Sequence, residues 1–319
     1  MPPENNQVPQ FVPPAPQSVS APTATTIPTP PTPVKIGKFK ASKLIVKESW
    51  NVLKQDKEIM WFPVLSSVVT LLVVLAMAAF YFFVLLGGSL ASFTGEGTVA
   101  ISDVVAYGTL FIYYLVIFFI VNFFEAGLYT IVQARFSGQN LGFSDGIRGA
   151  RQHMGKIFLW SLISATVGVI LRIIADKSAI IGKIVAGVLG AAWNILTYFS
   201  LPSLIVGNTS VKDSFKDSAS VIRKTWGETI IVNFGVGLFF FLIVILLMLV
   251  SIVLAIVLQS VIAAIVIGAL FILSVIILSI VSTTLGSIFK LALYNYAKNG
   301  VVPQGFSPDV VRGAIKVGK

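Results

Sequence analysis

The sequence has no cysteine and a single histidine, His153. The lack of cysteine excludes a disulfide framework, a thiolate metal site and a cysteine nucleophile, and it leaves the redox compartment unreadable. No metal-ligating partners surround His153 in its basic segment, so we interpret it as a surface or headgroup-facing residue. We therefore expect no metal site and no cofactor.

Charged residues are also scarce. They make up 11% of the 319 residues, whereas hydrophobic residues make up 56%. With a mean hydropathy of +0.91, this composition excludes a soluble protein of this length and predicts a polytopic membrane protein. The net charge is +10, but the basic residues lie beside apolar runs, so we expect no nucleic acid partner.

Catalytic motifs are missing too. The sequence has no HExxH, no P-loop and no GxSxG pattern. The apolar runs contain one carboxylate, Glu125, and no second one that would allow acid-base catalysis by a pair. We therefore predict that the protein is not an enzyme.

Residues 1–37 form a proline-rich segment that includes "FVPPAPQSVSAPTATTIPTPPTPV". It has few large apolar side chains, so burial cannot offset the entropy of ordering it, and we predict a disordered, partly polyproline II tail. It lacks the basic start and apolar core of a secretory signal. Its PxxP-like spacings fit an aromatic groove on a protein partner, although proline-rich linkers carry such matches by chance.

The remainder of the chain predicts an all-α membrane bundle over residues 38–300, followed by a short basic tail at 301–319. Residues 229–289 carry no charge and would extend ~90 Å as one helix, so we predict a reversal at Gln259–Ser260. Six runs reach the ~20 residues that a transmembrane helix needs. They are 62–86, 104–132, 157–175, 179–207, 229–257 and 261–289.

Basic residues are distributed unevenly around these spans. Seven lysines precede the first span, four Lys or Arg lie in 133–156, four lie in 208–228 and five lie from Lys290 to the end; only Arg172, Lys177 and Lys183 fall on the opposite side. Basic residues are retained on the cytoplasmic side of short loops. We therefore expect a multi-pass plasma membrane protein with both termini in the cytoplasm.

Each odd-numbered span follows a short amphipathic segment, which gives three helix-plus-hairpin units. In the first segment, Lys43 and Lys47 lie on one side of a helical wheel and Ile45 and Leu53 on the other. We expect these segments to lie as cytoplasmic helices in the membrane interface, where they contact anionic lipid headgroups.

The third segment adds a helix start, because Ser210 and Asp213 have the spacing of a capping box. Tryptophan near the membrane entry of each unit is typical of an aromatic belt. The predicted interfacial tryptophans are Trp50, Trp61, Trp160 and Trp226.

Several strings together resemble a known family: "FFEAGL", "GFSDGIRGA" with "KIFLWSLISATVG", "AWNILTYFSLPSLIV" and "DSFKDSASVIRKTWGE". Over roughly residues 40–300 the chain resembles a prokaryotic six-span integral membrane family whose domain is of unknown function. It is also distantly similar to the membrane domain fused to some glycerophosphodiester phosphodiesterases. The resemblance implies a six-span architecture and no established activity, and the chain has no phosphodiesterase domain.

Glu125 is the main candidate polar site. It lies ten residues before Arg135, about 15 Å along a helix. This places Glu125 in the cytoplasmic half of its span and lowers the free-energy cost of placing its charge in the membrane. Asn122 precedes it by one turn, and small Ala126 and Gly127 allow another helix to approach. We interpret Glu125 as a structural pin to a neighbouring helix through a Trp, Ser or backbone donor. The alternatives are a proton or cation site, or a carboxylate that reaches interfacial water.

Span four holds the other irregularity. Asn194 lies near mid-membrane, and Pro202 should kink the helix one or two turns before its end. Broken helices line binding sites in transporters, but membrane helices also tolerate proline without such a role. At the outer end of span three, Arg172 and Asp176 have the spacing of an i, i+4 ion pair.

Two functional hypotheses follow. The first is a non-enzymatic membrane scaffold that organises lipids and recruits a partner through its tail. The second is a transporter or channel with Glu125 at the cytoplasmic end of a polar pathway. Its lining would draw on few polar side chains: Glu125, Asn122, Asn194, Asn233, Ser282, Thr283 and Thr284. Spans five and six are almost wholly apolar, which favours the first hypothesis.

Overall fold

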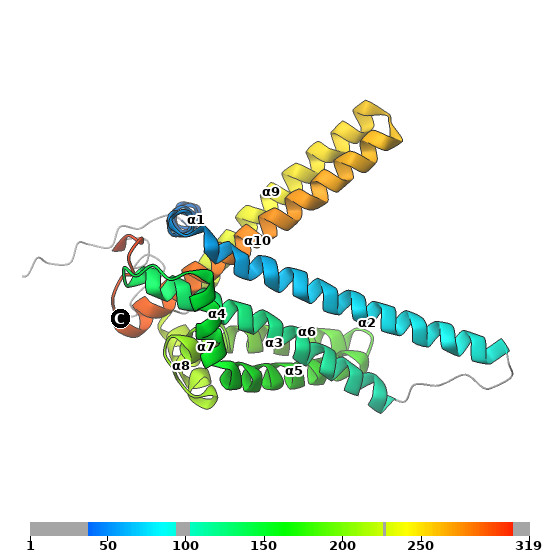
Figure 1. Cartoon of the computed structure of the whole chain (residues 1–319), viewed down its shortest axis with the longest axis horizontal. Coiled ribbons are helices and arrows are strands. Elements are labelled where there is room, and N and C mark those ends of the chain that lie inside the picture. The colour runs from blue at the N-terminus through cyan, green and yellow to red at the C-terminus, as the bar shows by residue number, and fades with distance from the viewer. Residues whose placement is uncertain (1–37, 94–102, 226–227, 309–319) are drawn as a thin grey trace, which may run out of the picture. The chain divides into compact units, whose positions relative to one another are not determined.

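A computed structural model describes residues 38–93, 103–225 and 228–308 (Figure 1). These residues form helices joined by turns. The elements in chain order are α1 (Lys38–Gln55), the 3-10 helix η1 (Lys57–Met60), α2 (Trp61–Phe93), α3 (Asp103–Phe136), α4 (Phe143–Gln152), α5 (Met154–Asp176), α6 (Ile181–Leu196), α7 (Ser200–Ile205), α8 (Val211–Thr225), α9 (Glu228–Leu258) and α10 (Val261–Asn299). The predicted proline-rich tail at 1–37 lies outside the described residues.

Among the described residues, six helical segments are long and apolar enough to cross a membrane. They are Lys57–Val84, Val105–Phe136, Met154–Asp176, Ile181–Ile205, Gly237–Leu258 and Val261–Asn299. The prediction of an all-α chain with six candidate membrane spans is therefore confirmed. The element order also repeats, because each of the short helices α1, α4 and α8 precedes a pair of long helical segments.

The predicted reversal between the last two spans is confirmed. α9 ends at Leu258 and α10 begins at Val261, so only Gln259 and Ser260 connect them. Gln259 has a positive φ of 47°, a conformation that costs a non-glycine residue ~1–2 kcal/mol. The Ser260 hydroxyl caps α10 by accepting the Ala263 N–H at 3.4 Å.

The last helix continues past the predicted end of the last span. The sequence places the end of that span at residue 289, whereas α10 continues to Asn299 and stops at Gly300, which has a φ of 70° and donates its N–H to the Tyr296 carbonyl at 2.8 Å. Ten more residues are therefore helical. They include Lys290, which the sequence had placed beyond the span.

Span four is interrupted and not merely kinked. α6 ends at Leu196, residues Thr197 to Phe199 form a turn, and Pro202 lies in the first turn of α7. A continuous helix would bring the proline ring against the Tyr198 carbonyl and would lack one N–H donor. The first turn of a new helix needs no intrahelical N–H bond, so the break removes both costs.

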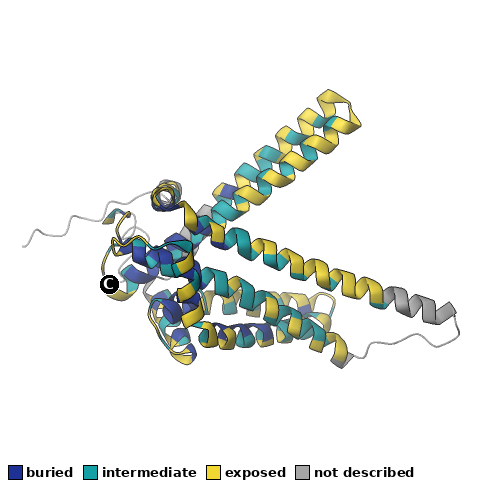
Figure 2. Cartoon of the chain, viewed as in Figure 1, coloured by how far each residue is buried: buried dark blue, intermediate teal, exposed yellow. Residues whose placement is uncertain are grey.

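Buried side chains gather where the short helices meet the ends of α3 and α10 (Figure 2). This core contains Ile45 of α1, Tyr129 of α3, Phe199 before α7, Val221 of α8 and Leu293 of α10. In contrast, most large apolar side chains are exposed in residues 61–84 of α2, in residues 237–258 of α9 and in the first half of α10. Exposed apolar surface of that extent is expected where lipid is the surrounding solvent.

The apolar side of α1 is covered by protein. Ile45, Val52 and Leu53 are buried, and α1 packs against α9 and α10. The start of the predicted C-terminal tail also contacts α1, because the Glu48 carboxylate accepts hydrogen bonds from the Ser307 N–H at 3.2 Å and hydroxyl at 2.6 Å.

Candidate functional site

Glu125 lies on α3 at the edge of the buried core and forms an ion pair with Lys290 of α10. Its Oε1 atom accepts hydrogen bonds from the Tyr129 hydroxyl at 2.5 Å, the Lys290 ammonium at 3.2 Å and the Ser287 hydroxyl at 3.4 Å. The two charged side chains are 23% and 17% exposed, respectively. Glu125 therefore joins α3 to α10, partly through the serine donor that the sequence predicted.

Lys290 is the residue that sequence reasoning missed. Its ammonium group lies 5.0 Å from the centre of the Tyr198 ring and 5.8 Å from that of Tyr129. Aromatic faces at these distances attract a cation. Its sequence neighbourhood offered one signal, since the apolar residues that follow it in "KLALYNYA" continue at helical spacing.

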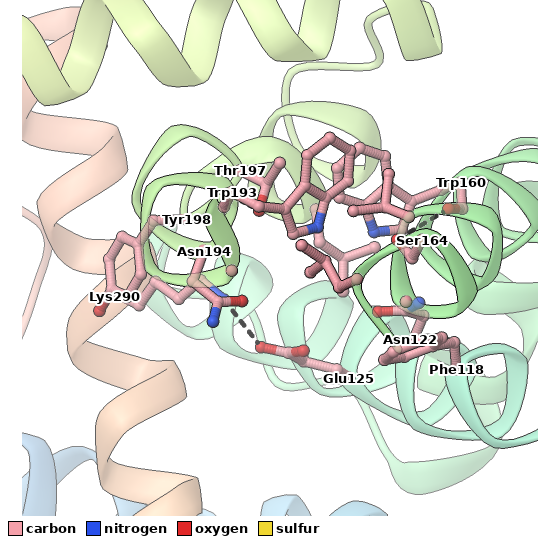
Figure 3. A pocket seen from close by; sticks show the side chains of 15 residues that line it. Phe118, Asn122, Glu125, Trp160, Ser164, Trp193, Asn194, Thr197, Tyr198 and Lys290 are labelled. Carbon is pink, nitrogen blue, oxygen red and sulfur yellow. Dashed lines mark hydrogen bonds and ion pairs between the residues drawn. The ribbon is translucent and has the colours of Figure 1, made fainter. Parts of the chain in front are cut away.

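A cavity of about 490 Å³ lies beside this ion pair (Figure 3). It is bounded by one side each of α3, α5 and α6, by the turn between α6 and α7, and by Lys290. Polar groups cluster near Glu125, while Phe118, Val167 and Leu171 form an apolar part. The cavity thus combines a charged region with an apolar wall inside candidate membrane spans.

The structure brings three of the four predicted site residues to this cavity. Glu125, Asn122 and Asn194 all line it. The Asn122 amide donates to the Ser161 hydroxyl at 3.1 Å and so links α3 to α5. Pro202 does not line the cavity; it lies buried in α7, and the helix break before it frees Thr197 and Tyr198 to line the cavity wall.

The tryptophans take different positions. Trp50 and Trp61 are 37% and 56% exposed. Trp160 is instead only 5% exposed and stacks on Trp193, with ring centres 6.2 Å apart and planes 11° from parallel. Trp160 therefore packs on protein, because these rings and Phe215 of α8 form an aromatic cluster, and its interfacial position stays a prediction. Trp226 lies outside the described residues.

A second, smaller cavity lies on the other side of Glu125. It has a volume of about 110 Å³ and is bounded by α2, α3 and α10. Glu125 lines both cavities, and Thr283 and Ser287 line the smaller one. The carboxylate therefore stands between two hollow regions.

Asp217 of α8 organises a second polar cluster that the sequence did not indicate. Its carboxylate accepts hydrogen bonds from the Lys298 ammonium at 2.5 Å, the Ser203 hydroxyl at 2.9 Å and the Tyr294 hydroxyl at 3.4 Å. Burial raises the pKa of Asp217, but the bonds from Lys298 and Ser203 outweigh it and hold the pKa below its usual value of 3.8. This cluster ties α7, α8 and α10 together.

One local prediction is confirmed and a second is confirmed in part, because only one of the two bonds of the predicted capping box forms. The Arg172 guanidinium and the Asp176 carboxylate form the expected i, i+4 ion pair at 3.0 Å. At the start of α8, the Ser210 hydroxyl accepts the Asp213 N–H at 3.1 Å and donates to its carboxylate at 2.7 Å. The hydrogen bond from Ser210 is the main cause of a lowered pKa of Asp213.

Among the described residues, no group of three or more His, Cys, Asp or Glu side chains is placed to hold a metal ion. The polar arrangement around Glu125 consists instead of one carboxylate, one ammonium and neutral donors. Its chemistry is that of ion pairing and hydrogen bonding to a ligand or to neighbouring helices.

Residues 104–305 match a family of unknown function, DUF6159. The chain belongs to this family. Every residue that lines the larger cavity lies within the matched region. No curated protein and no solved structure matches the chain.

Proposed function

We propose that the protein is a non-enzymatic multi-pass protein of the plasma membrane that organises lipids through basic side chains on its short helices. Both termini would lie in the cytoplasm, because the sequence places most basic residues on one side of the spans. A reporter enzyme fused to either end should be active only in the cytoplasm. Activity on the outer side would contradict the orientation.

The observation that supports this proposal is the exposure of basic groups on helices whose apolar sides are buried. Lys43, Lys47 and Lys54 are exposed on α1 while its apolar side packs on protein. Arg148 of α4 and Lys216 of α8 have side chains that are each 72% exposed. These cations flank the spans, and a basic residue near an anionic membrane surface contributes ~1 kcal/mol of attraction.

The test measures the lipids that co-purify with the full chain. Native nanodiscs, extracted from the membrane with an amphipathic polymer, should be enriched in anionic phospholipid relative to the bulk membrane. Replacing Lys43, Lys47 and Lys54 together with glutamine should remove much of this enrichment. The matched control replaces Lys177 and Lys183, which lie on the opposite side of the predicted topology, and should leave it unchanged. Equal enrichment in both variants would contradict the proposal.

Recruitment of a protein partner by the proline-rich tail at 1–37 extends the same proposal. Its support is the sequence alone, because polyproline II segments bind aromatic grooves. Deleting the tail should remove any partner that crosslinks to the full chain in membranes. It should leave the lipid enrichment intact.

Transport is the second candidate function, and the position of Glu125 between two cavities favours it. A pathway through α3, α5, α6 and α10 would pass this carboxylate, as polar side chains in membrane spans often mark ion or substrate routes. Flux into proteoliposomes should then collapse in both Glu125→Gln and Glu125→Ala. Flux of an ion or solute that both variants abolish while they remain folded would replace the lipid-organising proposal.

A further inference from the structure

The larger cavity contains polar groups that have no hydrogen-bond partner among the described residues. All three hydrogen bonds that the described residues donate to Glu125 end on Oε1, so Oε2 accepts none of them. Trp160 is 5% exposed, yet within the described part of the chain neither its indole N–H nor that of Trp193 donates a hydrogen bond. Figure 3 shows both indole nitrogens on the side of the rings that faces Glu125 and Asn122.

An indole N–H inside the membrane-spanning region normally has a hydrogen-bond partner. Neither indole nitrogen is among the fully buried side-chain atoms of the described residues that lack a partner, so both are accessible from the cavity that Trp160, Trp193 and Asn194 line. These donors fit an anionic oxygen. The free Oε2 of Glu125 is an acceptor that fits an ammonium. The cavity therefore offers complementary contacts for both signs of charge.

The balance of charge restricts the ligand further. Glu125 and Lys290 are the charged residues that line the cavity, and they neutralise each other. A ligand with a net charge would bring an uncompensated charge into a region of low dielectric constant, which is costly. A zwitterion brings both charges together and leaves the site neutral.

The apolar wall indicates what the zwitterion carries. Phe118 lies seven residues from Glu125 on α3, about 10 Å along the helix, and Val167 and Leu171 extend the apolar wall on α5. The volume of about 490 Å³ is in the ordinary range for a ligand site. An amphiphile fits a cavity with one charged end and one apolar wall. Its headgroup would lie at the ion pair and its chain along the apolar wall.

We propose that this cavity binds one zwitterionic amphiphile. Its ammonium binds Oε2 of Glu125, and its anionic group binds the indole N–H groups of Trp160 and Trp193 and the amide of Asn194. A phospholipid with an ethanolamine headgroup has this chemistry, and so does free phosphoethanolamine without the chain. The site uses none of the basic side chains of α1, α4 and α8, so it does not depend on the proposed function.

The experiment measures lipid retention by the full chain with native mass spectrometry. The delipidated protein is exposed to equimolar phosphatidylethanolamine and phosphatidylglycerol in detergent. We expect one phosphatidylethanolamine to remain bound at activation energies that strip phosphatidylglycerol. Free phosphoethanolamine should not displace it, because the chain contributes to binding; displacement would assign the site to a soluble zwitterion. Equal retention of the two lipids, or retention of neither, would overturn the proposal.

Two variants test the assigned contacts. Trp193→Phe keeps the ring stack on Trp160 but removes one donor, and Glu125→Gln removes the negative charge; each should weaken phosphatidylethanolamine retention on the order of tenfold. Trp61→Phe makes the same change at an exposed tryptophan outside the cavity and should have no effect. Retention unchanged in both cavity variants would overturn the assignment. If Glu125→Gln unfolds, Trp193→Phe decides alone.

Discussion

Replacing Glu125 with alanine should destabilise the protein, because it removes the acceptor that α3 and α10 share. The variant leaves the hydroxyl of Tyr129, which is fully buried, without its carboxylate partner, and an unpaired buried donor costs ~1–3 kcal/mol. It also leaves Lys290 without a counter-charge. Breaking a fully buried ion pair on one side costs ~3–5 kcal/mol.

The cost of breaking the ion pair is reduced here because Glu125 and Lys290 line a cavity that solvent or ligand can enter. Their side chains are 23% and 17% exposed, respectively. We therefore expect a total loss of ~3 kcal/mol in the free energy of unfolding. At roughly 2–4 °C per kcal/mol, the melting temperature in detergent should fall by roughly 6–12 °C. Glu125→Gln keeps an oxygen acceptor and should cost only ~1 kcal/mol.

Thermal unfolding of the purified protein, followed by static light scattering, is the assay. Asp176→Ala is the matched control, because it breaks an exposed ion pair with Arg172 and should cost less than ~1 kcal/mol. The double variant Glu125→Gln with Lys290→Met leaves no isolated charge and should melt above Glu125→Gln alone, in which Lys290 lacks its counter-charge. If Glu125→Ala melts as Asp176→Ala does, the carboxylate is not a structural pin.

Three further changes should alter stability in defined ways. The pKa of Asp217 is lowered in the folded protein. The ionised carboxylate therefore stabilises the fold above its usual pKa, and this stabilisation is lost as pH falls through the lowered pKa. Asp217→Asn should melt at a lower temperature than the native chain at neutral pH, and the difference should shrink below about pH 4. A Cβ at Gly149 would lie 2.5 Å from Thr130 Cγ2, so Gly149→Ala should cost ~1–3 kcal/mol and Thr130→Ala should recover part of it, as chemical denaturation would measure. Ser260→Ala removes the cap of α10 and should lower the melting temperature by a few degrees, since such caps contribute ~1 kcal/mol; no change in a differential scan would show that the hairpin does not need it.

The helices were predictable because each depends on a local signal. Long apolar runs indicate spans, and Gln259–Ser260 interrupts the longest run at the point where the chain reverses. The Arg172–Asp176 pair and the Ser210 cap follow from spacing within one helix. What the sequence did not indicate is that the last helix continues ten residues past the predicted span end, because Lys290 resembles the basic residue that usually follows a membrane helix.

The site was only partly predictable, because its contacts join residues far apart in the sequence. Glu125 was identified as costly in hydrocarbon, but its partner Lys290 lies 165 positions later. Asp217 appeared to be one charge among many on an amphipathic helix, although it binds Lys298 and Ser203. The burial of Trp160 depends on Trp193 and Phe215, and no spacing rule relates these three residues.

The two-residue turn between α9 and α10 has a topological consequence that does not depend on the distribution of basic residues. Helices joined so tightly and packed along each other must enter a bilayer as one hairpin. The start of α9 and the end of α10 then emerge at the same surface. α8 and the segment after Gly300 therefore share a compartment, whichever side of the membrane that is, and the bond between Lys298 and Asp217 forms there.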